Sequence, residues 1–225
     1  MWRILSSKQG VTLVELVVVM SIIGIIALFG VPEIMRFVSD SKARSCATDL
    51  IQNMKIAKSM ALKENRPYLI TFDTANKRYM IGFDGDGDND LITLNSDTFG
   101  ICKDTDSDRL PEGDVLVNGV PDCVKVVNLS SCGSSIDFGT MAPASSLPGD
   151  TCSNGKVCFD GSTNHQYITF NRNGSIAETG SVYIMHADRG FSYCVDILNV
   201  SGSMNMWKWN GDEDNLTVTE WTELR

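Results

Sequence analysis

The sequence has few residues of the kinds that build metal or catalytic centres. Only two histidines, His165 and His186, occur among 225 residues, and none of the seven cysteines forms a C-x-x-C pair. Zinc sites need several nitrogen and sulfur ligands at short spacing, and the sequence offers no such set. It also contains no phosphate-binding glycine loop, no dinucleotide-binding fingerprint and no metalloprotease helix. We therefore expect no enzymatic activity.

Positive charge is also scarce. Nineteen lysines and arginines stand against 28 aspartates and glutamates, which gives a formal net charge of −9. Proteins that bind nucleic acid neutralise phosphates with a basic surface, so this balance argues against a nucleic acid partner. An acidic surface favours solubility, cation binding or contact with a basic partner.

A long apolar run stands near the amino terminus. Between residues 11 and 31 the single ionisable residue is Glu15. At about 1.5 Å per residue, a helix of this length spans the hydrocarbon core of a bilayer. A carboxylate inside such a segment is costly unless a cation pairs with it. The short leader, residues 1–10, carries Arg3 and Lys8, which favour its retention on the cytoplasmic side.

The order of these segments differs from that of a secretory signal, in which the cleavage site follows the apolar run. Here it predicts a cut after Gly10 that leaves the helix attached to the product. The region resembles type IV prepilin-like proteins, with Gly10 before the cut, Glu15 as the fifth mature residue and Pro32 as the twenty-second. Val11 replaces the phenylalanine usual in that family. The resemblance implies cleavage by prepilin peptidase, N-methylation of Val11, and pairing of Glu15 with the amino group of a neighbouring subunit.

Residues 32–65 predict an amphipathic continuation of the helix. Pro32 is expected to kink it, and Asn65 with Pro67 is expected to end it. Apolar residues recur in this segment at spacings of three and four, which predicts one face packed on a domain. These residues are Ala47, Leu50, Ile51, Met54, Ala57 and Ala61.

Residues 66–225 predict an extracytoplasmic, β-rich globular domain. The whole chain is therefore expected to be α+β, with a long amino-terminal helix whose first half (residues 11–31) spans the membrane. Its second half would pack on a mostly antiparallel sheet, as in pilins. Strands are predicted at residues 68–72, 78–83, 115–117, 124–129, 166–170, 181–185, 192–197 and 204–209, with a long loop at about 139–155.

A second resemblance concerns residues 57–71, 167–174 and 195–206, which are similar to the GspH/FimT-like minor pseudopilins and minor pilins. It implies an inner-membrane, single-pass subunit with a periplasmic or extracellular domain, which assembles with other subunits into a type II secretion pseudopilus or a type IV pilus. DNA-binding members of that group typically carry arginines in the last segment. Residues 203–208 contain one lysine and no arginine, so a pilus-associated DNA-uptake receptor is the less favoured alternative.

One acidic loop is a candidate calcium site. Asp84, Asp86, Asp88 and Asp90 alternate with glycine or asparagine, and oxygen ligands at this spacing suit Ca²⁺, as in the first half of an EF-hand loop. The alternative is a solvated Asp-Gly turn. If the loop binds Ca²⁺, the chain could instead be a membrane-tethered, calcium-dependent binding module or adhesin.

Cysteines and tryptophans give two further predictions. In an oxidising compartment disulfides are expected, and Cys152 with Cys158, or Cys123 with Cys132, are close enough in sequence to bridge locally. Connectivity stays open, and Cys46 on the helix is the expected free thiol. Three tryptophans near the carboxyl terminus predict either a half-buried strand face or an exposed binding patch, and we favour the former. They are Trp207, Trp209 and Trp221.

Overall fold

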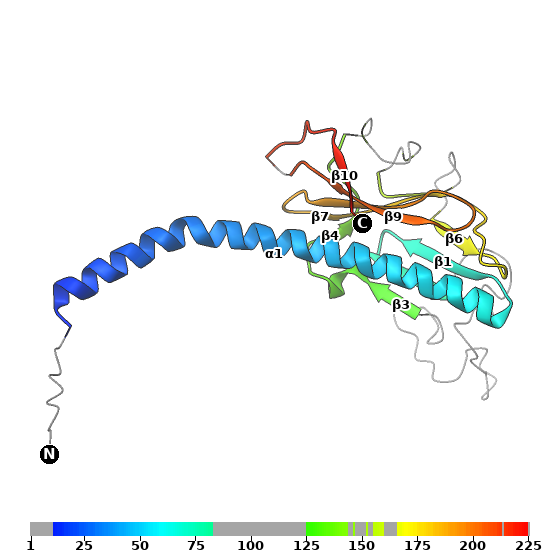
Figure 1. The fold of residues 1–225 in the computed structure, drawn as a ribbon, viewed down its shortest axis with the longest axis horizontal. Helices are drawn as coiled ribbons and strands as arrows, with labels where there is room; N and C mark the ends of the chain where they lie inside the picture. Colours follow the sequence, from blue (N-terminus) through cyan, green and yellow to red (C-terminus); the bar gives the residue numbers. More distant parts are fainter. Residues whose placement is uncertain are drawn as a thin grey trace, which may run out of the picture. The chain divides into compact units, whose positions relative to one another are not determined.

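The computed structural model describes most of the chain as one helix and ten strands. The described residues are 11–82, 125–143, 146, 152, 155–159, 166–212 and 214–224. The chain divides into two compact units, Met1–Val38 and Ser39–Arg225. Figure 1 shows the elements in order, and each unit is described below by itself.

Helix α1 (Leu13–Glu64) begins with a capping box. The backbone N–H of Glu15 donates to Thr12 Oγ1 at 3.2 Å, and the backbone N–H and hydroxyl of Thr12 donate to Glu15 Oε2, each at 3.4 Å. This reciprocal arrangement satisfies two backbone donors that no preceding turn can pair. The helical conformation then continues through Pro32.

The predicted end of the helix is confirmed. Asn65 adopts a left-handed conformation (φ 54°), and the N–H of Arg66 donates to the carbonyl of Ala61 at 3.3 Å. This is the bond pattern of a Schellman-type ending, in which a left-handed residue turns the chain away from the axis. Pro67 follows and cannot continue the helix.

In the unit Ser39–Arg225 the second half of α1 buries one face, as the three- and four-residue spacing predicts. Buried positions on α1 are Ala43, Cys46, Ala47, Leu50, Asn53, Met54, Ala57 and Ala61. All of them except Asn53 share one hydrophobic core with inward-facing residues of both sheets, including Phe72 of β1, Ile184 of β7 and Val195 of β8.

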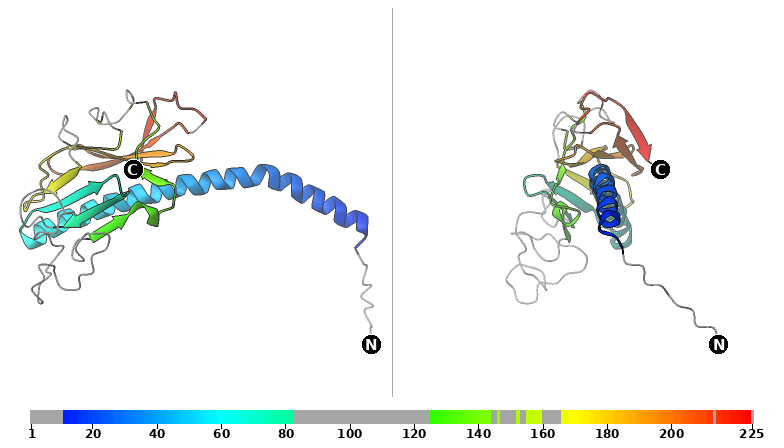
Figure 2. Two further views of the ribbon diagram at one scale, coloured as in Figure 1. Left: turned by 180° about the vertical axis from the view of Figure 1, so that it is seen from behind. Right: turned by 90° about the vertical axis from the view of Figure 1, so that its left-hand side faces the viewer.

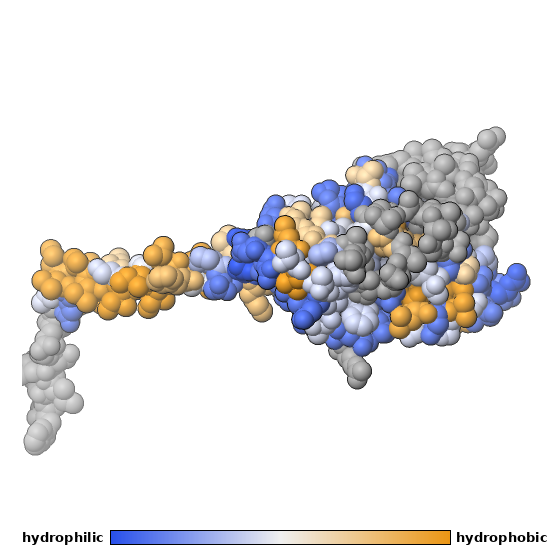
Figure 3. Space-filling view, turned by 90° about the horizontal axis from the view of Figure 1, so that it is seen from above, coloured by the Kyte–Doolittle hydropathy of each residue, from blue (hydrophilic) through white to orange (hydrophobic). Residues whose placement is uncertain are grey.

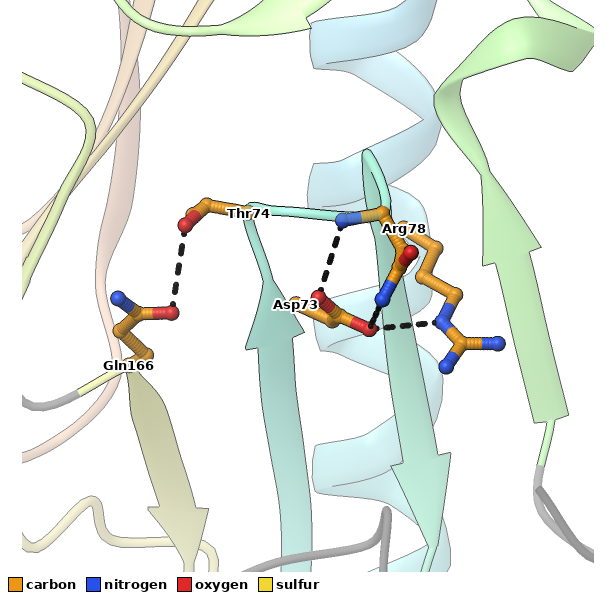
Figure 4. Close-up of polar contacts among 5 residues, drawn as sticks. Asp73, Thr74, Arg78 and Gln166 are labelled. Atoms are coloured by element: carbon orange, nitrogen blue, oxygen red, sulfur yellow. Dashed lines mark hydrogen bonds and ion pairs between the residues drawn. The ribbon is translucent and has the colours of Figure 1, made fainter. Parts of the chain in front are cut away.

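The smaller sheet has four antiparallel strands in the order β3-β2-β1-β6. Its strands are β1 (Tyr68–Asp73), β2 (Arg78–Gly82), β3 (Lys125–Asn128) and β6 (Tyr167–Phe170). Asp73 closes the β1–β2 turn by accepting bonds from Asn76 N (3.1 Å), Asn76 Nδ2 (2.7 Å) and Arg78 Nε (2.9 Å). Figure 4 shows this turn, and shows Thr74 bonded to Gln166, the residue directly before β6.

The larger sheet has the order β10-β9-β8-β7-β4, and β5 also pairs with β7. Figure 2 shows the strands and α1 from two further sides. All its pairings are antiparallel. Its strands are β4 (Ile136–Phe138), β5 (Val157–Phe159), β7 (Gly180–His186), β8 (Ser192–Ile197), β9 (Met204–Trp209) and β10 (Trp221–Leu224). A 3₁₀ turn, η1 (Leu129–Ser131), follows β3 directly and lies on the segment that leads to β4.

The three carboxyl-terminal tryptophans belong to a second, smaller core that includes Tyr183, Cys194, Cys152 and Cys158. Trp209 is fully buried, and its Nε1 donates to the carbonyl of Val218 at 2.8 Å. Trp207 and Trp221 are half-buried and pack against the same cluster. The prediction of a half-buried strand face is therefore confirmed.

The cysteine predictions need one correction. Cys152 and Cys158 are bonded, as their spacing predicted, with Cα atoms 5.2 Å apart. The prediction that Cys46 is free is wrong, because Cys46 is bonded to Cys132 across 5.7 Å between Cα atoms. Cys132 follows η1, which brings it against the buried face of α1, so it is not available to Cys123. Among the described residues the free thiol is Cys194, which is buried.

Candidate assembly site

The first part of α1 presents apolar side chains on every side. Each residue from position 11 to position 29 is exposed within the subunit, including Phe29 at 71%. Orange side chains accordingly cover this part of the helix in the space-filling view (Figure 3). Among the described residues, α1 is the one helix long and apolar enough to cross a membrane. A surface this apolar needs lipid or other helices around it.

Glu15 is the one charged side chain in this apolar surface, and the structure gives it a local role. Its Oε2 accepts both bonds from Thr12, so the carboxylate turns back over the first turn of α1. The positive end of the helix dipole lies at the same place and favours the negative charge. Among the described residues, no hydrogen bond or ion pair of the Glu15 carboxylate reaches beyond this turn, and the carboxylate stays exposed. The site can therefore receive a cation from outside the subunit.

The other predicted site residues fall in different places. Val11 is exposed and lies directly before the helix, at the same end as Glu15, and Pro32 lies inside the helix. Gly10 and Cys123 lie outside the described residues, as do the four loop aspartates Asp84, Asp86, Asp88 and Asp90. Within the described ranges no three histidine, cysteine or acidic side chains gather as a metal site. Calcium binding by the loop stays a prediction.

Sequence reasoning missed a polar clamp between α1 and the larger sheet. Asp40 accepts a hydrogen bond from the Tyr193 hydroxyl at 2.7 Å and forms an ion pair with Lys208 Nζ at 2.7 Å. Burial raises the pKa of Tyr193, and the Asp40 carboxylate raises it further, so the hydroxyl stays protonated and donates. These residues lie more than 150 positions apart, so only the strand register could have revealed the clamp.

The clamp also bears on the DNA-binding alternative. Lys208 is the only basic residue of residues 203–208, where DNA-binding members of the resembling group carry arginines. Its ammonium group points to Asp40 and lies 5.9 Å from the ring centres of Phe191 and Tyr193. A lysine held in this way is a poor contact for a phosphate, because it is already neutralised.

A second polar contact fastens α1 to the smaller sheet. Asn53, on the buried face of the helix, donates from Nδ2 to the Tyr79 hydroxyl at 2.7 Å and accepts from Lys125 Nζ at 2.6 Å. Burial raises the pKa of Tyr79, which keeps this hydroxyl neutral. The second half of α1 is thus bound to both sheets by polar contacts as well as by its apolar stripe.

Comparison with known proteins gives two family matches. Residues 5–31 match the prokaryotic N-terminal methylation motif, and residues 47–202 match the type II transport protein GspH. No curated protein matches the chain. Among solved structures, the minor pseudopilin EpsH from the type 2 secretion system of Vibrio cholerae is similar at 10% identity, with a TM-score of 0.40. That match covers 73% of this chain and 95% of EpsH.

The GspH match spans well over half of the sequence and includes α1 from residue 47 onward and strands of both sheets. The methylation motif covers the apolar first part of the helix, including Val11 and Glu15. The chain belongs to the GspH family of type II transport proteins and is a pseudopilin subunit with an amino-terminal methylation motif.

Proposed function

We propose that the chain is made as a prepilin, cut between Gly10 and Val11, N-methylated at Val11, and assembled as a minor subunit of a type II secretion pseudopilus. Prepilin peptidase would remove residues 1–10. The unit Ser39–Arg225 would lie outside the cytoplasmic membrane, where the Cys46–Cys132 and Cys152–Cys158 bonds are stable. The observation that carries this proposal is an apolar helix surface that the subunit itself does not cover.

That surface suits two environments in turn. Lipid chains are as apolar as the side chains of valine and isoleucine, so α1 loses little apolar contact when it passes from the bilayer into a bundle of similar helices. Residues 13–29 bury nothing within the subunit and are therefore free for either environment. Membrane anchoring before assembly and helix packing after it need no change in this segment.

Glu15 supplies the specific element. Cleavage after Gly10 would create an α-amino group on Val11, and in an apolar bundle an ammonium group is the natural partner for the carboxylate. The Thr12 bonds engage Oε2 of the same carboxylate and orient it at the start of the helix. We infer that the amino group of a neighbouring subunit meets Glu15 and sets the axial position of one helix against the next.

Mass spectrometry of the intact protein recovered from membranes tests the processing. The expected polypeptide begins at Val11 and carries one methyl group on its amino nitrogen. A bulky charged residue at the cleavage site, as in Gly10→Arg, should leave the leader attached. Recovery of a native chain that begins at Met1, or downstream of residue 31, would contradict the proposal.

Two substitutions separate the assembly role of Glu15 from its capping role. Glu15→Gln keeps a side-chain oxygen that can accept the Thr12 bonds but removes the charge, whereas Glu15→Ala removes both. If a charge pair drives assembly, both variants should be cleaved and membrane-inserted yet largely absent from sheared pseudopili. Normal incorporation of Glu15→Gln would show that Glu15 serves only as a helix cap.

A further inference from the structure

Four Asn-X-Ser/Thr triplets occur in the sequence, and this triplet is the acceptor motif for N-linked oligosaccharides. They begin at Asn128, Asn173, Asn199 and Asn215, and all four lie within the described residues. The motif is short and common, so the structure around each copy decides whether an enzyme could bind it. A usable copy lies on an exposed surface loop, outside the cytoplasm.

Three of the four triplets are held in the fold. In the first and the second the middle residue is buried, at Leu129 and at Gly174. In the third, Asn199 closes the turn between β8 and β9. Its Oδ1 accepts hydrogen bonds from Ser201 Oγ at 2.6 Å and from the backbone N–H of Ser203 at 3.2 Å. An enzyme that bound any of these triplets would have to break the structure around it.

The fourth triplet lies on an exposed segment. Asn215, Leu216 and Thr217 are all exposed, and they lie between β9 and β10. Thr217 Oγ1 donates to Asn215 Oδ1 at 3.3 Å, a longer bond than the corresponding one of the third triplet. This bond engages the amide oxygen and not Nδ2, the atom to which a sugar is joined. An enzyme can therefore bind this triplet without opening the core.

The sequence before the fourth triplet also sets it apart. Bacterial oligosaccharyltransferases select acceptors that have an acidic residue two positions before the asparagine. Glu213 stands at that position before Asn215. In the other three triplets the position is held by Val126, Asn171 and Ile197. Exposure and local sequence thus single out the same asparagine, although they are independent of each other.

The segment between β9 and β10 lies on the face of the larger sheet that does not carry α1. It packs on the smaller core, where Trp209 Nε1 donates to the carbonyl of Val218. Figure 1 shows the segment on the side of the larger sheet away from α1. A glycan on Asn215 would therefore leave α1 uncovered, which is the surface through which assembly is proposed.

We propose that Asn215 is an acceptor for an N-linked oligosaccharide. The sugar donor would be an oligosaccharide carried on a polyprenyl diphosphate, and a membrane oligosaccharyltransferase would catalyse its transfer. A bond forms between Asn215 Nδ2 and the anomeric carbon while the bond from that carbon to the diphosphate oxygen breaks. The amide loses one proton, and polyprenyl diphosphate leaves. The inference rests on the proposed function, because it needs the unit Ser39–Arg225 outside the cytoplasm.

Peptide mass spectrometry of the native protein, purified from membranes in detergent, tests the inference. Trypsin cuts after lysine and arginine, so each triplet falls in a different peptide, and Asn215 falls in residues 209–225. We expect this peptide to carry sugar on Asn215, and the peptides that contain the other three triplets to carry none. A 209–225 peptide that is recovered only unmodified would overturn the proposal.

Substitutions that leave Asn215 in place sharpen the test. Thr217→Val keeps the shape of the side chain but removes its hydroxyl, so the occupancy of Asn215 should fall about tenfold or more. Glu213→Gln should also lower the occupancy. Ser201→Ala is the matched control, because it removes the hydroxyl of the third triplet and should change nothing. Unchanged occupancy in Thr217→Val would contradict transfer directed by the triplet.

The same digest separates this inference from the proposed function. A chain that begins at Val11 and has an unmodified Asn215 would contradict glycosylation alone, because cleavage has taken place. A chain that begins at Met1 and carries the glycan would contradict cleavage alone.

Discussion

The two halves of α1 have the same secondary structure and opposite relations to the rest of the molecule. Residues 13–38 have hydrophobic side chains all round, and most of them are exposed within the subunit. Residues 39–64 bury one side of the helix against the sheets, at seven hydrophobic positions and Asn53. The first half thus depends on an environment outside the subunit, whereas the second half is part of a folded core.

The comparison separates assembly from stability. Substitutions in the second half should change the free energy of unfolding of the unit Ser39–Arg225, and equivalent substitutions in the first half should not. Three of the four tryptophans lie in β9 and β10, so fluorescence of the full-length protein in detergent reports on that unit. The predictions below test this separation.

The largest difference is expected between Leu50→Asp and Leu28→Asp. Leu50 is fully buried, so an unpaired carboxylate there should destabilise the unit by more than about 4 kcal/mol. Leu28 is 71% exposed, so the same change should leave the tryptophan transition within about 0.5 kcal/mol. Leu28→Asp should instead reduce membrane insertion. Similar unfolding midpoints for both variants would refute the division.

The Cys46–Cys132 bond should matter next. It closes a loop of 86 residues, and the chain-entropy estimate for removing it with Cys46→Ala/Cys132→Ala is about 4–5 kcal/mol. The Cys152–Cys158 bond closes a loop of only six and should contribute about half as much. Urea unfolding of both double variants measures the difference. A larger loss on removing the Cys152–Cys158 bond would contradict this ranking by loop length.

A smaller effect is expected from the clamp. Asp40→Ala leaves Lys208 and the Tyr193 hydroxyl without their partner and should cost about 1–2 kcal/mol, since the ion pair is partly exposed. Glu33→Ala, about two helical turns earlier, is the control and should have no effect, because Glu33 is exposed. The melting temperatures of both variants measure the difference. If both fell equally, Glu33 would have to contribute to the folded core, which would contradict its exposure in the structure.

The smallest effect is expected on the pH dependence of stability. Burial tends to raise the pKa of Glu64, but hydrogen bonds from Tyr68 and Arg66 and the charge of Arg66 lower it below its usual value. A lowered folded-state pKa stabilises the protein above the unfolded value of about 4.3, and this stability is lost as pH falls through the folded pKa. Glu64→Gln should therefore reduce stability at pH 7 by less than about 1 kcal/mol and flatten its acid dependence. Asp49→Asn is the control.

Much of the fold could be predicted from patterns within short windows. The period of three to four residues predicted the buried face of α1, and alternation with turn residues predicted β1, β2, β3, β6, β7, β8 and β9 to within one or two residues. The short strands β4, β5 and β10 were missed, because segments of three or four residues have no measurable period. They are strands because a neighbouring strand, β7 or β9, extends past them, not because of their own residues. The strand predicted at residues 115–117 lies outside the described residues.

The site shows the same limit. The apolar run and Glu15 are local, so the sequence alone predicted the assembly helix, although its Thr12-x-x-Glu15 capping box was overlooked as a signal. The clamp of Asp40 and the bond of Cys46 depend on contacts between distant segments. Such contacts follow from sheet register, which spacing does not determine.

The alanines that line the buried face of α1 limit how this protein can vary. Ala43, Ala47, Ala57 and Ala61 have no exposed surface, and every replacement except glycine adds volume where none is free. Almost every substitution at these positions is therefore destabilising, whereas the exposed positions beside them accept many side chains. Related subunits can diverge in what they touch while the spacing between helix and strands hardly changes.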